Sequence, residues 1–250
     1  MNETALVTGG TGTLGRIVAG KLREAGVSTR VLSRHAKAGI AVGDLASGVG
    51  VDAALVGVST VIHCATGKND EKQSANLIAA ARRAGVSHLV YISIVGVDRH
   101  PFAYYRAKCA VERRVESSGL PFTILRATQF HNLIVGILSA QRPSPFILVP
   151  DVPIQPVEVS EVAQRLVELS QSGPAGRVPD LGGPQIRRLR ELAALWRTAT
   201  GRRRVLLPLV LPGRTFRAFS AGLHLAPEHA DGTVTFEQFL ATSVTGPVPR

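Results

Sequence analysis

Short runs of β-branched and other apolar residues alternate with longer amphipathic stretches through the first two thirds of the chain. This rhythm is typical of a parallel sheet that helices cover on both faces. Helical spacing of apolar residues is clearest in Glu71–Ala84, and a second helix is expected over Tyr104–Ser118. The pattern predicts an α/β fold with a doubly wound parallel sheet. The expected strands are Thr4–Thr8, Thr29–Leu32, Ile40–Val42, Thr60–Cys64, Leu89–Ser93 and Phe122–Arg126.

Prolines become dense after about Leu138, and this ends the regular alternation of strands and helices. Helices are expected again over Val159–Leu169, Arg188–Thr200 and Thr215–Leu223. We therefore predict one larger part over residues 1–140 and a smaller, irregular region over residues 141–250 that packs on the sheet. The two parts can also be counted as one domain.

The composition indicates a folded protein of a reducing compartment. The chain has 250 residues, of which 45% are hydrophobic, and these are enough for one sizeable core. Its two cysteines cannot form a disulfide framework. We expect no secretory signal at the N-terminus, and the apolar run Val205–Leu211 is far shorter than the roughly 20 residues of a membrane span. We expect a soluble, cytoplasmic protein without a membrane partner.

The net charge of +11 comes from 24 arginines and 5 lysines that are spread over most of the chain. Ten of the arginines lie between Arg177 and Arg217. They form either a solvated surface or a docking face for an acidic partner or substrate. Because no helix-turn-helix, zinc-finger spacing or basic and aromatic array accompanies the charge, we expect no nucleic-acid partner.

A glycine-rich loop follows the first expected strand and leads directly into a helical stretch. Glycines at this spacing allow a sharp turn and a close approach to a pyrophosphate, while the helix N-terminus offers free N–H groups. A turn without a ligand is the alternative, but the strand–loop–helix context favours a dinucleotide site. The residues expected to contact the cofactor are Gly9, Thr11, Gly12, Thr13, Leu14 and Gly15.

The second expected strand ends in residues that favour NADP over NAD. An acidic residue at this place would accept the ribose hydroxyl of NAD, whereas Ser33 and Arg34 occupy it here. A guanidinium can hold the phosphate of NADP with two parallel hydrogen bonds, and Arg16 lies close enough in sequence to help. Alternatively, Arg34 is only a solvated loop residue.

A serine, a tyrosine and a lysine form the candidate catalytic group. Ser93 ends the fifth expected strand, and Tyr104 precedes Lys108 by four residues on the next helix, so that both share one helical face. Hydride transfer to or from an oxygen-bearing carbon needs a proton donor or acceptor. We expect Tyr104 in that role, Lys108 lowering the tyrosine pKa, and Ser93 orienting the substrate oxygen. Tyr105 is the competing phenol, but it stands only three residues before the lysine.

These features together resemble one known protein family. The glycine spacing and the segments Tyr91–Asp98, Tyr104–Glu112, Ser118–Phe130 and Gln155–Ala163 look like the atypical short-chain dehydrogenase/reductases of the NmrA-like group. The resemblance covers about the first 170 residues. It implies a Rossmann fold and an NAD(P) cofactor, and it does not specify a substrate.

The resemblance also implies further cofactor contacts. Asp44 and Leu45 would hold the edge of the adenine. A loop of Cys64, Ala65 and Thr66 would lie over the nicotinamide ribose, and Lys108 would bind the same ribose. Ala127, Thr128 and Phe130 would line the mouth of the site for the nicotinamide and the substrate. Asn76 lies on the helix that carries the family's active-site asparagine, without a secure match. His131 is expected to be structural, with a proton relay as the alternative. The neighbours His63 and Cys64 point to opposite faces of a strand, so we expect no metal.

The leading hypothesis is an NADP-dependent oxidoreductase that acts on a small or medium carbonyl, alcohol or quinone as a monomer or homodimer. Two alternatives remain open. A sensor would bind NADP without turnover, although such members of the group commonly lack the tyrosine. A nucleotide-sugar epimerase or dehydratase would use the same three residues, although these enzymes are usually longer.

Overall fold

The computed structural model describes residues 4–35, 39–67, 69–141 and 144–244. Within them the chain forms two compact units, and neither is continuous in sequence. The first unit takes the residues up to Ser93, Ala103–Arg126 and Ser160–Pro179, and the second takes Ile94–Phe102, Ala127–Val159 and the residues from Asp180 onward.

The first unit is built on a sheet that has seven strands among the described residues, in the order β3-β2-β1-β4-β5-β6-β9. The pairs β1–β2, β1–β4, β2–β3, β4–β5 and β6–β9 are parallel. The order reverses at β1, and this is the place where open α/β sheets bind ligands. The prediction of a doubly wound α/β fold is confirmed. The strands are β1 Thr4–Thr8, β2 Ser28–Ser33, β3 Ile40–Val42, β4 Thr60–His63, β5 His88–Ile94, β6 Phe122–Ala127 and β9 Gly176–Arg177.

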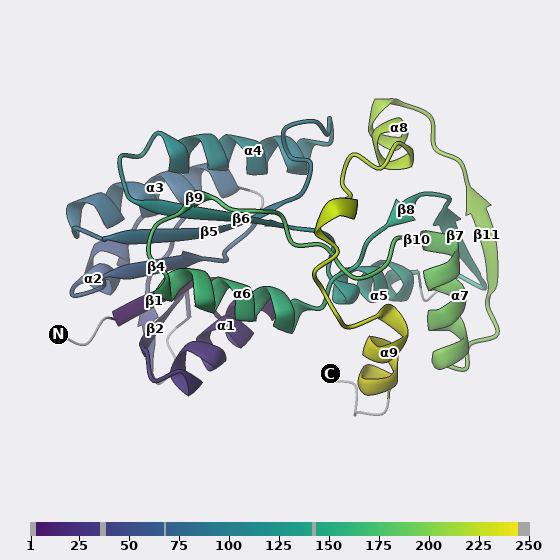
Figure 1. Cartoon of the computed structure of the whole chain (residues 1–250), viewed down its shortest axis with the longest axis horizontal. Coiled ribbons are helices and arrows are strands. Elements are labelled where there is room, and N and C mark those ends of the chain that lie inside the picture. The colour runs from purple at the N-terminus through teal and green to yellow at the C-terminus, as the bar shows by residue number, and fades with distance from the viewer. Residues whose placement is uncertain (1–3, 36–38, 68, 142–143, 245–250) are drawn as a thin grey trace. The chain divides into compact units, whose positions relative to one another are not determined.

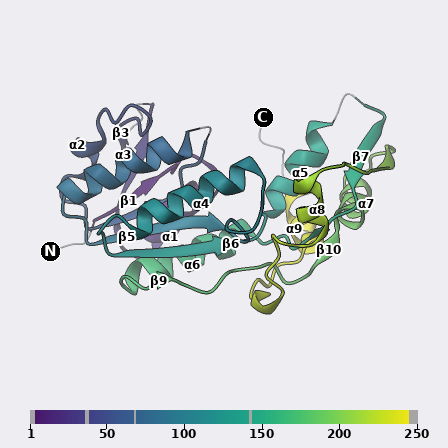
Figure 2. The same cartoon turned by 90° about the horizontal axis from the view of Figure 1, so that it is seen from above.

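Helices cover both faces of this sheet. Figure 1 shows α1 (Thr13–Glu24) and α6 (Val159–Gln171) on one face, and α3 (Asp70–Arg83) and α4 (Ala103–Glu116) on the other. Figure 2 shows α3 and α4 from above. A short helix, α2 (Val51–Leu55), precedes β4. Because both faces are covered, the central strands are almost continuously apolar and their side chains are buried.

The second unit contains two small sheets and several short helices. In one sheet β10 (Arg187–Arg188) pairs antiparallel with β8 (Pro153–Ile154), and in the other β11 (Val205–Leu209) pairs parallel with β7 (Phe146–Pro150). Its core gathers around Trp196, which is 2% exposed. The helices of this unit are α5 His131–Ala140, α7 Leu189–Ala199, α8 Arg214–Ser220, the 3-10 helix Pro227–His229 and α9 Phe236–Val244.

The arrangement differs from the expected one mainly beyond residue 140. Helix α6 and strand β9 belong to the first unit, and β9 extends the main sheet by pairing with Thr123 and Ile124 of β6. A strand of two residues is too short for an alternating pattern, so sequence analysis could not find it. The proline-rich segment forms β7 and β8. The boundary between two domains near residue 140 stays a prediction.

Candidate active site

The glycine loop is the turn that joins β1 to α1. Gly9 has a φ of +65°, which favours glycine, and a Cβ atom there would lie 2.7 Å from the Ala65 backbone. A Cβ atom on Gly15 would lie 2.4 Å from the Gly9 carbonyl oxygen. Both glycines therefore allow the loop to fold closely against its neighbours. Gly12 is the N-cap of α1, and no side chain among the described residues caps it.

The open part of this loop can accept an anion. Thr11, Gly12 and Thr13 are exposed, whereas Leu14 and Gly15 are buried under the first turn of α1. That turn carries no acidic side chain, and its N–H groups and the positive end of the helix dipole favour a phosphate. The loop therefore offers N–H donors to a phosphate, and its contact with the pyrophosphate of the cofactor stays a prediction.

The residues expected to select the cofactor lie at the end of β2, and those expected to hold the adenine follow β3. Ser33 ends β2, and Arg34 follows it with an exposed side chain. The Asp44 carboxylate accepts hydrogen bonds from Ala46 N (2.9 Å) and Ser47 Oγ (3.1 Å). The Ala46 bond is the main reason why the pKa of Asp44 is lowered. Asp44 therefore stabilises its own turn. Its contact with the adenine, which the resemblance implies, stays a prediction.

Asn76 supports the same turn from α3. Its side-chain amide donates to Leu45 O at 2.8 Å and to Ala46 O at 3.3 Å. The buried Leu45 side chain belongs to the core of the first unit. Asn76 thus holds the turn at Asp44 and Leu45, and among the described residues no hydrogen bond joins it to Tyr104 or Lys108.

The end of β4 brings together His63, Cys64, Ala65 and Thr66. The His63 ring is buried between Thr8 Oγ1, 2.7 Å from Nδ1, and Ser74 Oγ, 2.9 Å from Nε2. Burial, together with the charge of Lys108, lowers the pKa of His63 to about 3. Burial raises the pKa of the Cys64 thiol to about 12. Both groups are therefore neutral near neutral pH. No group of three or more His, Cys, Asp or Glu side chains in the described part of the chain is arranged to hold a metal.

The three candidate catalytic residues lie on β5 and α4 of the first unit. Ser93 is 3% exposed, and its Oγ has no hydrogen-bond partner among the described residues. Tyr104 lies in the first turn of α4 and is 39% exposed. Lys108, one turn later, is buried. Tyr105 is 4% exposed and packs into the core, so the exposed phenol is that of Tyr104.

Lys108 has a partner that the sequence did not reveal. Its Nζ lies 3.7 Å from Asp70 Oδ2 and 5.0 Å from the centre of the Tyr91 ring. Asp70 Oδ2 also accepts a hydrogen bond of 2.8 Å from Thr66 Oγ1, whose oxygen lies 3.1 Å from Tyr104 Oη. Asp70 begins α3, and no motif marks it in the sequence.

The expected effect of Lys108 on the tyrosine pKa is not what the structure shows. The pKa of Tyr104 is raised, first because the hydroxyl is partly buried and also because the Asp70 carboxylate lies near. The expectation of a lowered pKa was therefore wrong, because burial disfavours the charged phenolate more than its hydrogen bond with Thr66 favours it. Burial also lowers the pKa of Lys108 itself.

The remaining predicted contacts belong to the second unit. Ala127 ends β6 and forms a bridge with Leu181, and Thr128 Oγ1 accepts a hydrogen bond of 3.3 Å from Gly183 N. Phe130 is the N-cap of α5. His131 lies 3.0 Å from Val234 O through Nε2 and stacks on a phenylalanine ring, as expected for a structural histidine.

Part of the arginine-rich segment has internal partners. Arg187 pairs with Glu237 at 2.9 Å, and the Arg202 guanidinium lies 5.1 Å from the centre of the Trp196 ring. Arg204 donates to the carbonyl oxygens of Ser144, at 2.9 Å, and Phe146, at 2.8 Å. These three arginines therefore stabilise the second unit.

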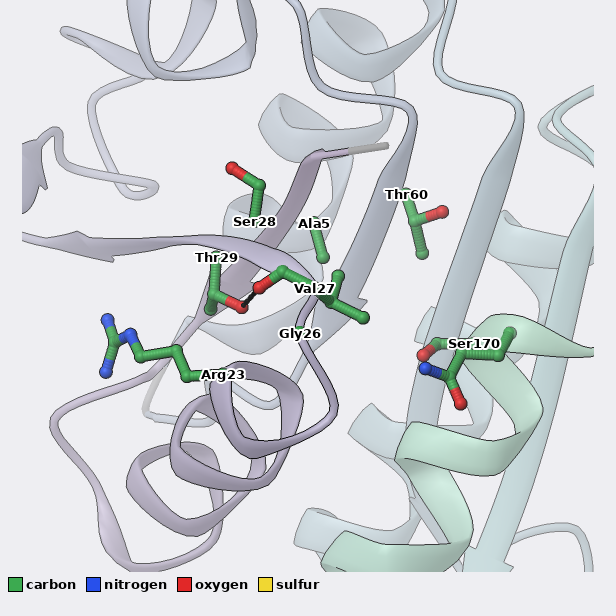
Figure 3. A pocket seen from close by; sticks show the side chains of 9 residues that line it. Ala5, Arg23, Gly26, Val27, Ser28, Thr29, Thr60 and Ser170 are labelled. Atoms are coloured by element: carbon green, nitrogen blue, oxygen red, sulfur yellow. Dashed lines mark hydrogen bonds between the residues drawn. The ribbon is translucent and has the colours of Figure 1, made fainter. Parts of the chain in front are cut away.

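A cavity of about 560 Å³ lies at the amino-terminal ends of the strands of the main sheet (Figure 3). Its lining includes Ala5, Ser28 and Thr60, at or near the first residues of β1, β2 and β4. Arg23 also lines it, and the Thr29 hydroxyl bonds to Val27 O at 2.8 Å. Because cofactors of parallel sheets bind at the carboxyl ends of the strands, this cavity is separate from the cofactor site.

Comparison with known proteins identifies the family. A profile of a family described as NAD(P)H-binding matches residues 9–136, from the glycine loop to α5. The chain belongs to this NAD(P)H-binding family. The match confirms the expected NAD(P)H cofactor.

Two relatives that match most of this NAD(P)H-binding protein are named as reductases. It is 33% identical to (4-alkanoyl-5-oxo-2,5-dihydrofuran-3-yl)methyl phosphate reductase of Streptomyces griseus, over 79% of this chain and 74% of that protein. It is 29% identical to NAD(P)H azoreductase of Xenophilus azovorans, over the same shares of 79% and 74%. The predicted class of NAD(P)-dependent oxidoreductase is confirmed at this level.

Solved structures confirm the fold of the family member. The crystal structure of an NADPH-dependent quinone oxidoreductase of Escherichia coli in complex with NADPH matches with a TM-score of 0.80 and 20% identity. The match covers 95% of this chain and 99% of that one. Among the described residues of this NAD(P)H-binding protein, the helices are too short or too polar to cross a membrane.

Proposed function

We propose that the protein is an NADPH-dependent reductase of a small or medium carbonyl compound or quinone. The names of its relatives support this substrate class, since they include an acyl dihydrofuranone phosphate reductase and, among solved structures, a quinone oxidoreductase. The single observation that carries the proposal is the buried Ser93 hydroxyl, which has no hydrogen-bond partner in the described part of the chain. Such a group costs about 1–3 kcal/mol unless a ligand completes its hydrogen bonds.

The residues of the first unit fit the cofactor. Gly9 and Gly15 allow the loop before α1 to fold closely, because neither position has room for a Cβ atom. A pyrophosphate would bind on this loop, at the exposed start of α1. Arg34, exposed at the end of β2, would bind the 2′-phosphate that distinguishes NADPH from NADH. Lys108 would hold the nicotinamide ribose, with Thr66 beside it. Bound NADPH supplies the hydride.

The chain's own groups would handle the substrate oxygen. Ser93 Oγ donates a hydrogen bond that orients the oxygen, and Tyr104 donates the phenolic proton to it as the carbon accepts the hydride. The resulting tyrosinate recovers a proton from water, which reaches the 39% exposed side chain. A phenol whose pKa is raised is a competent acid in this direction.

Oxidation of NADPH in the presence of a panel of carbonyl compounds and quinones tests the proposal. We expect turnover with NADPH, slower turnover with NADH, and a loss of about 100-fold or more in kcat for Tyr104→Phe. Tyr105→Phe is the matched control, because it removes the neighbouring phenol, which faces the core. Unchanged turnover of Tyr104→Phe with every accepted substrate would refute the assignment. Tight NADPH binding without any turnover would favour the sensor. Cytoplasmic location and a monomeric or homodimeric state stay predictions.

A further inference from the structure

Asp70 is a buried carboxylate next to the candidate proton donor. It is 4% exposed at the start of α3, although aspartate side chains are rarely buried without a partner. Its Oδ1 accepts a hydrogen bond from Gly67 N, and its Oδ2 accepts one from Thr66 Oγ1 at 2.8 Å and faces Lys108 Nζ at 3.7 Å. The positive end of α3 also favours a carboxylate at this place. These contacts leave the position of Asp70 little freedom.

Through Thr66, Asp70 sets the direction of the hydrogen bond of Tyr104. Thr66 has one hydroxyl hydrogen, and it is donated to Asp70. A Thr66 hydrogen turned toward Tyr104 would lower the pKa of the phenol, but the charged Asp70 carboxylate at 2.8 Å is the stronger acceptor of that hydrogen. The Thr66 oxygen, 3.1 Å from Tyr104 Oη, therefore accepts from the phenol. As a result, the tyrosine is held as a protonated phenol.

Through charge, Asp70 acts on both residues of the Tyr-x-x-x-Lys pair. Its carboxylate disfavours a second negative charge on Tyr104, and it favours the positive charge on Lys108. Without Asp70, the negative charge that opposes tyrosinate would be lost.

We infer that Asp70 is a positioning residue that keeps Tyr104 protonated, so that the site is set for reduction and poorly set for alcohol oxidation. This inference rests on the proposed function. Reduction needs a phenol that gives up its proton while the substrate carbon accepts the hydride. Oxidation needs a tyrosinate that removes a proton, and the Asp70 carboxylate opposes its formation.

Other titratable groups surround the pair from several elements. Tyr91 on β5 and Tyr105 on α4 lie beside Tyr104, the latter with its ring centre 6.4 Å away. Cys64 at the end of β4 and Glu112 on α4 lie near Lys108. Burial keeps the Tyr91 hydroxyl protonated as well, with a pKa well above its usual value. The two alternative sources of a tyrosinate signal are thus Tyr91 and Tyr105.

Titration of the tyrosines in the protein without cofactor tests the inference. The chain has only three tyrosines, so the near-ultraviolet absorbance of tyrosinate is simple to assign. Tyr104→Phe identifies the step of Tyr104 by its loss. We expect this step above the ordinary pKa of about 10 in the wild type, and lower by at least about half a pH unit in Asp70→Asn.

Glu71→Gln is the matched control. It removes the same charge from the next residue of α3, but Glu71 is exposed and paired with Arg114 at 2.6 Å. We expect the Tyr104 step to stay in place in this variant. An unshifted step in folded Asp70→Asn overturns the inference. A wild-type step at or below the ordinary tyrosine pKa overturns it too, and this measurement does not depend on whether Asp70→Asn folds.

The pH dependence of turnover provides a second measurement that a purely structural role would not move. In the wild type, alcohol oxidation should rise only at strongly alkaline pH, and in Asp70→Asn the rise should move to lower pH. An oxidation profile identical in Asp70→Asn and wild type contradicts the inference. The tyrosine titration uses no substrate, so it tests the effect of Asp70 on Tyr104 even if the protein turns over no substrate. An absence of all turnover would refute the proposed function alone.

Discussion

A buried ion pair joins the helix of Tyr104 and Lys108 to the main sheet. Arg126 on β6 binds Glu112 on α4 through two hydrogen bonds, from Nε to Oε1 at 2.9 Å and from one terminal nitrogen to Oε2 at 2.7 Å. The side chains are 7% and 1% exposed. Arg177, which is 43% exposed, adds a contact of 3.2 Å to the same carboxylate. The position of α4 therefore depends on a charged contact that water does not screen.

Arg126→Met is expected to destabilise the protein strongly. Removing one partner of a buried pair leaves the other charge uncompensated, which costs about 3–5 kcal/mol. Because Arg177 still reaches Glu112, we expect the lower end, about 3 kcal/mol, out of a total stability of about 5–15 kcal/mol. Urea denaturation of the variant and the wild type measures this difference.

Two further variants separate the ion pair from a general effect of losing an arginine. Arg114→Met removes an exposed ion pair, in which the Arg114 and Glu71 side chains are 48% and 52% exposed. This loss should lower the free energy of unfolding by no more than about 1 kcal/mol. The double variant Arg126→Met and Glu112→Leu removes both charges and should recover most of the lost stability. A loss below about 1 kcal/mol in Arg126→Met, or a double variant as unstable as the single one, would refute the reasoning.

Three other predictions concern the cofactor and pH. Gly15→Ala should weaken NADPH binding about tenfold or more, because its Cβ would lie 2.4 Å from the Gly9 oxygen. Arg34→Ala should weaken NADPH binding roughly 10- to 100-fold, as expected for a lost charged hydrogen bond, and should leave NADH binding unchanged. Burial lowers the pKa of His63 to about 3 and that of His224 to about 4, so the unfolded state binds more protons. Stability should therefore fall as the pH drops from about 6 to about 4, by about 1.4 kcal/mol per pH unit for each histidine.

Fluorescence titration with NADPH and NADH checks the first two predictions, and urea denaturation at several pH values checks the third. Gly20→Ala is the control for the glycine, because a Cβ there meets nothing within 4 Å, and NADPH should bind it normally. Equal losses for both cofactors in Arg34→Ala would exclude a phosphate contact. His63→Gln should reduce the pH slope by about 1.4 kcal/mol per pH unit, and an unchanged slope would contradict the argument.

Much of the first unit could be predicted from the sequence, because its signals are local. Apolar alternation and the lengths of the runs predict six strands within about one residue of the observed ones. The glycine spacing predicts the crowded turn after β1, and four-residue spacing predicts that Tyr104 and Lys108 share a helix. Each of these features depends on neighbours within a few residues.

The electrostatics of the candidate site were decided by the tertiary structure. Thr66 and Tyr104 are 38 residues apart, and Asp70 reaches Lys108 only because α3 and α4 lie side by side on the sheet. The strand β9 is likewise recognisable only from its pairing with β6. The sequence alone determined which residue types are available for the chemistry. Burial and long-range charge, which no local pattern contains, decided that the Tyr104 pKa is raised.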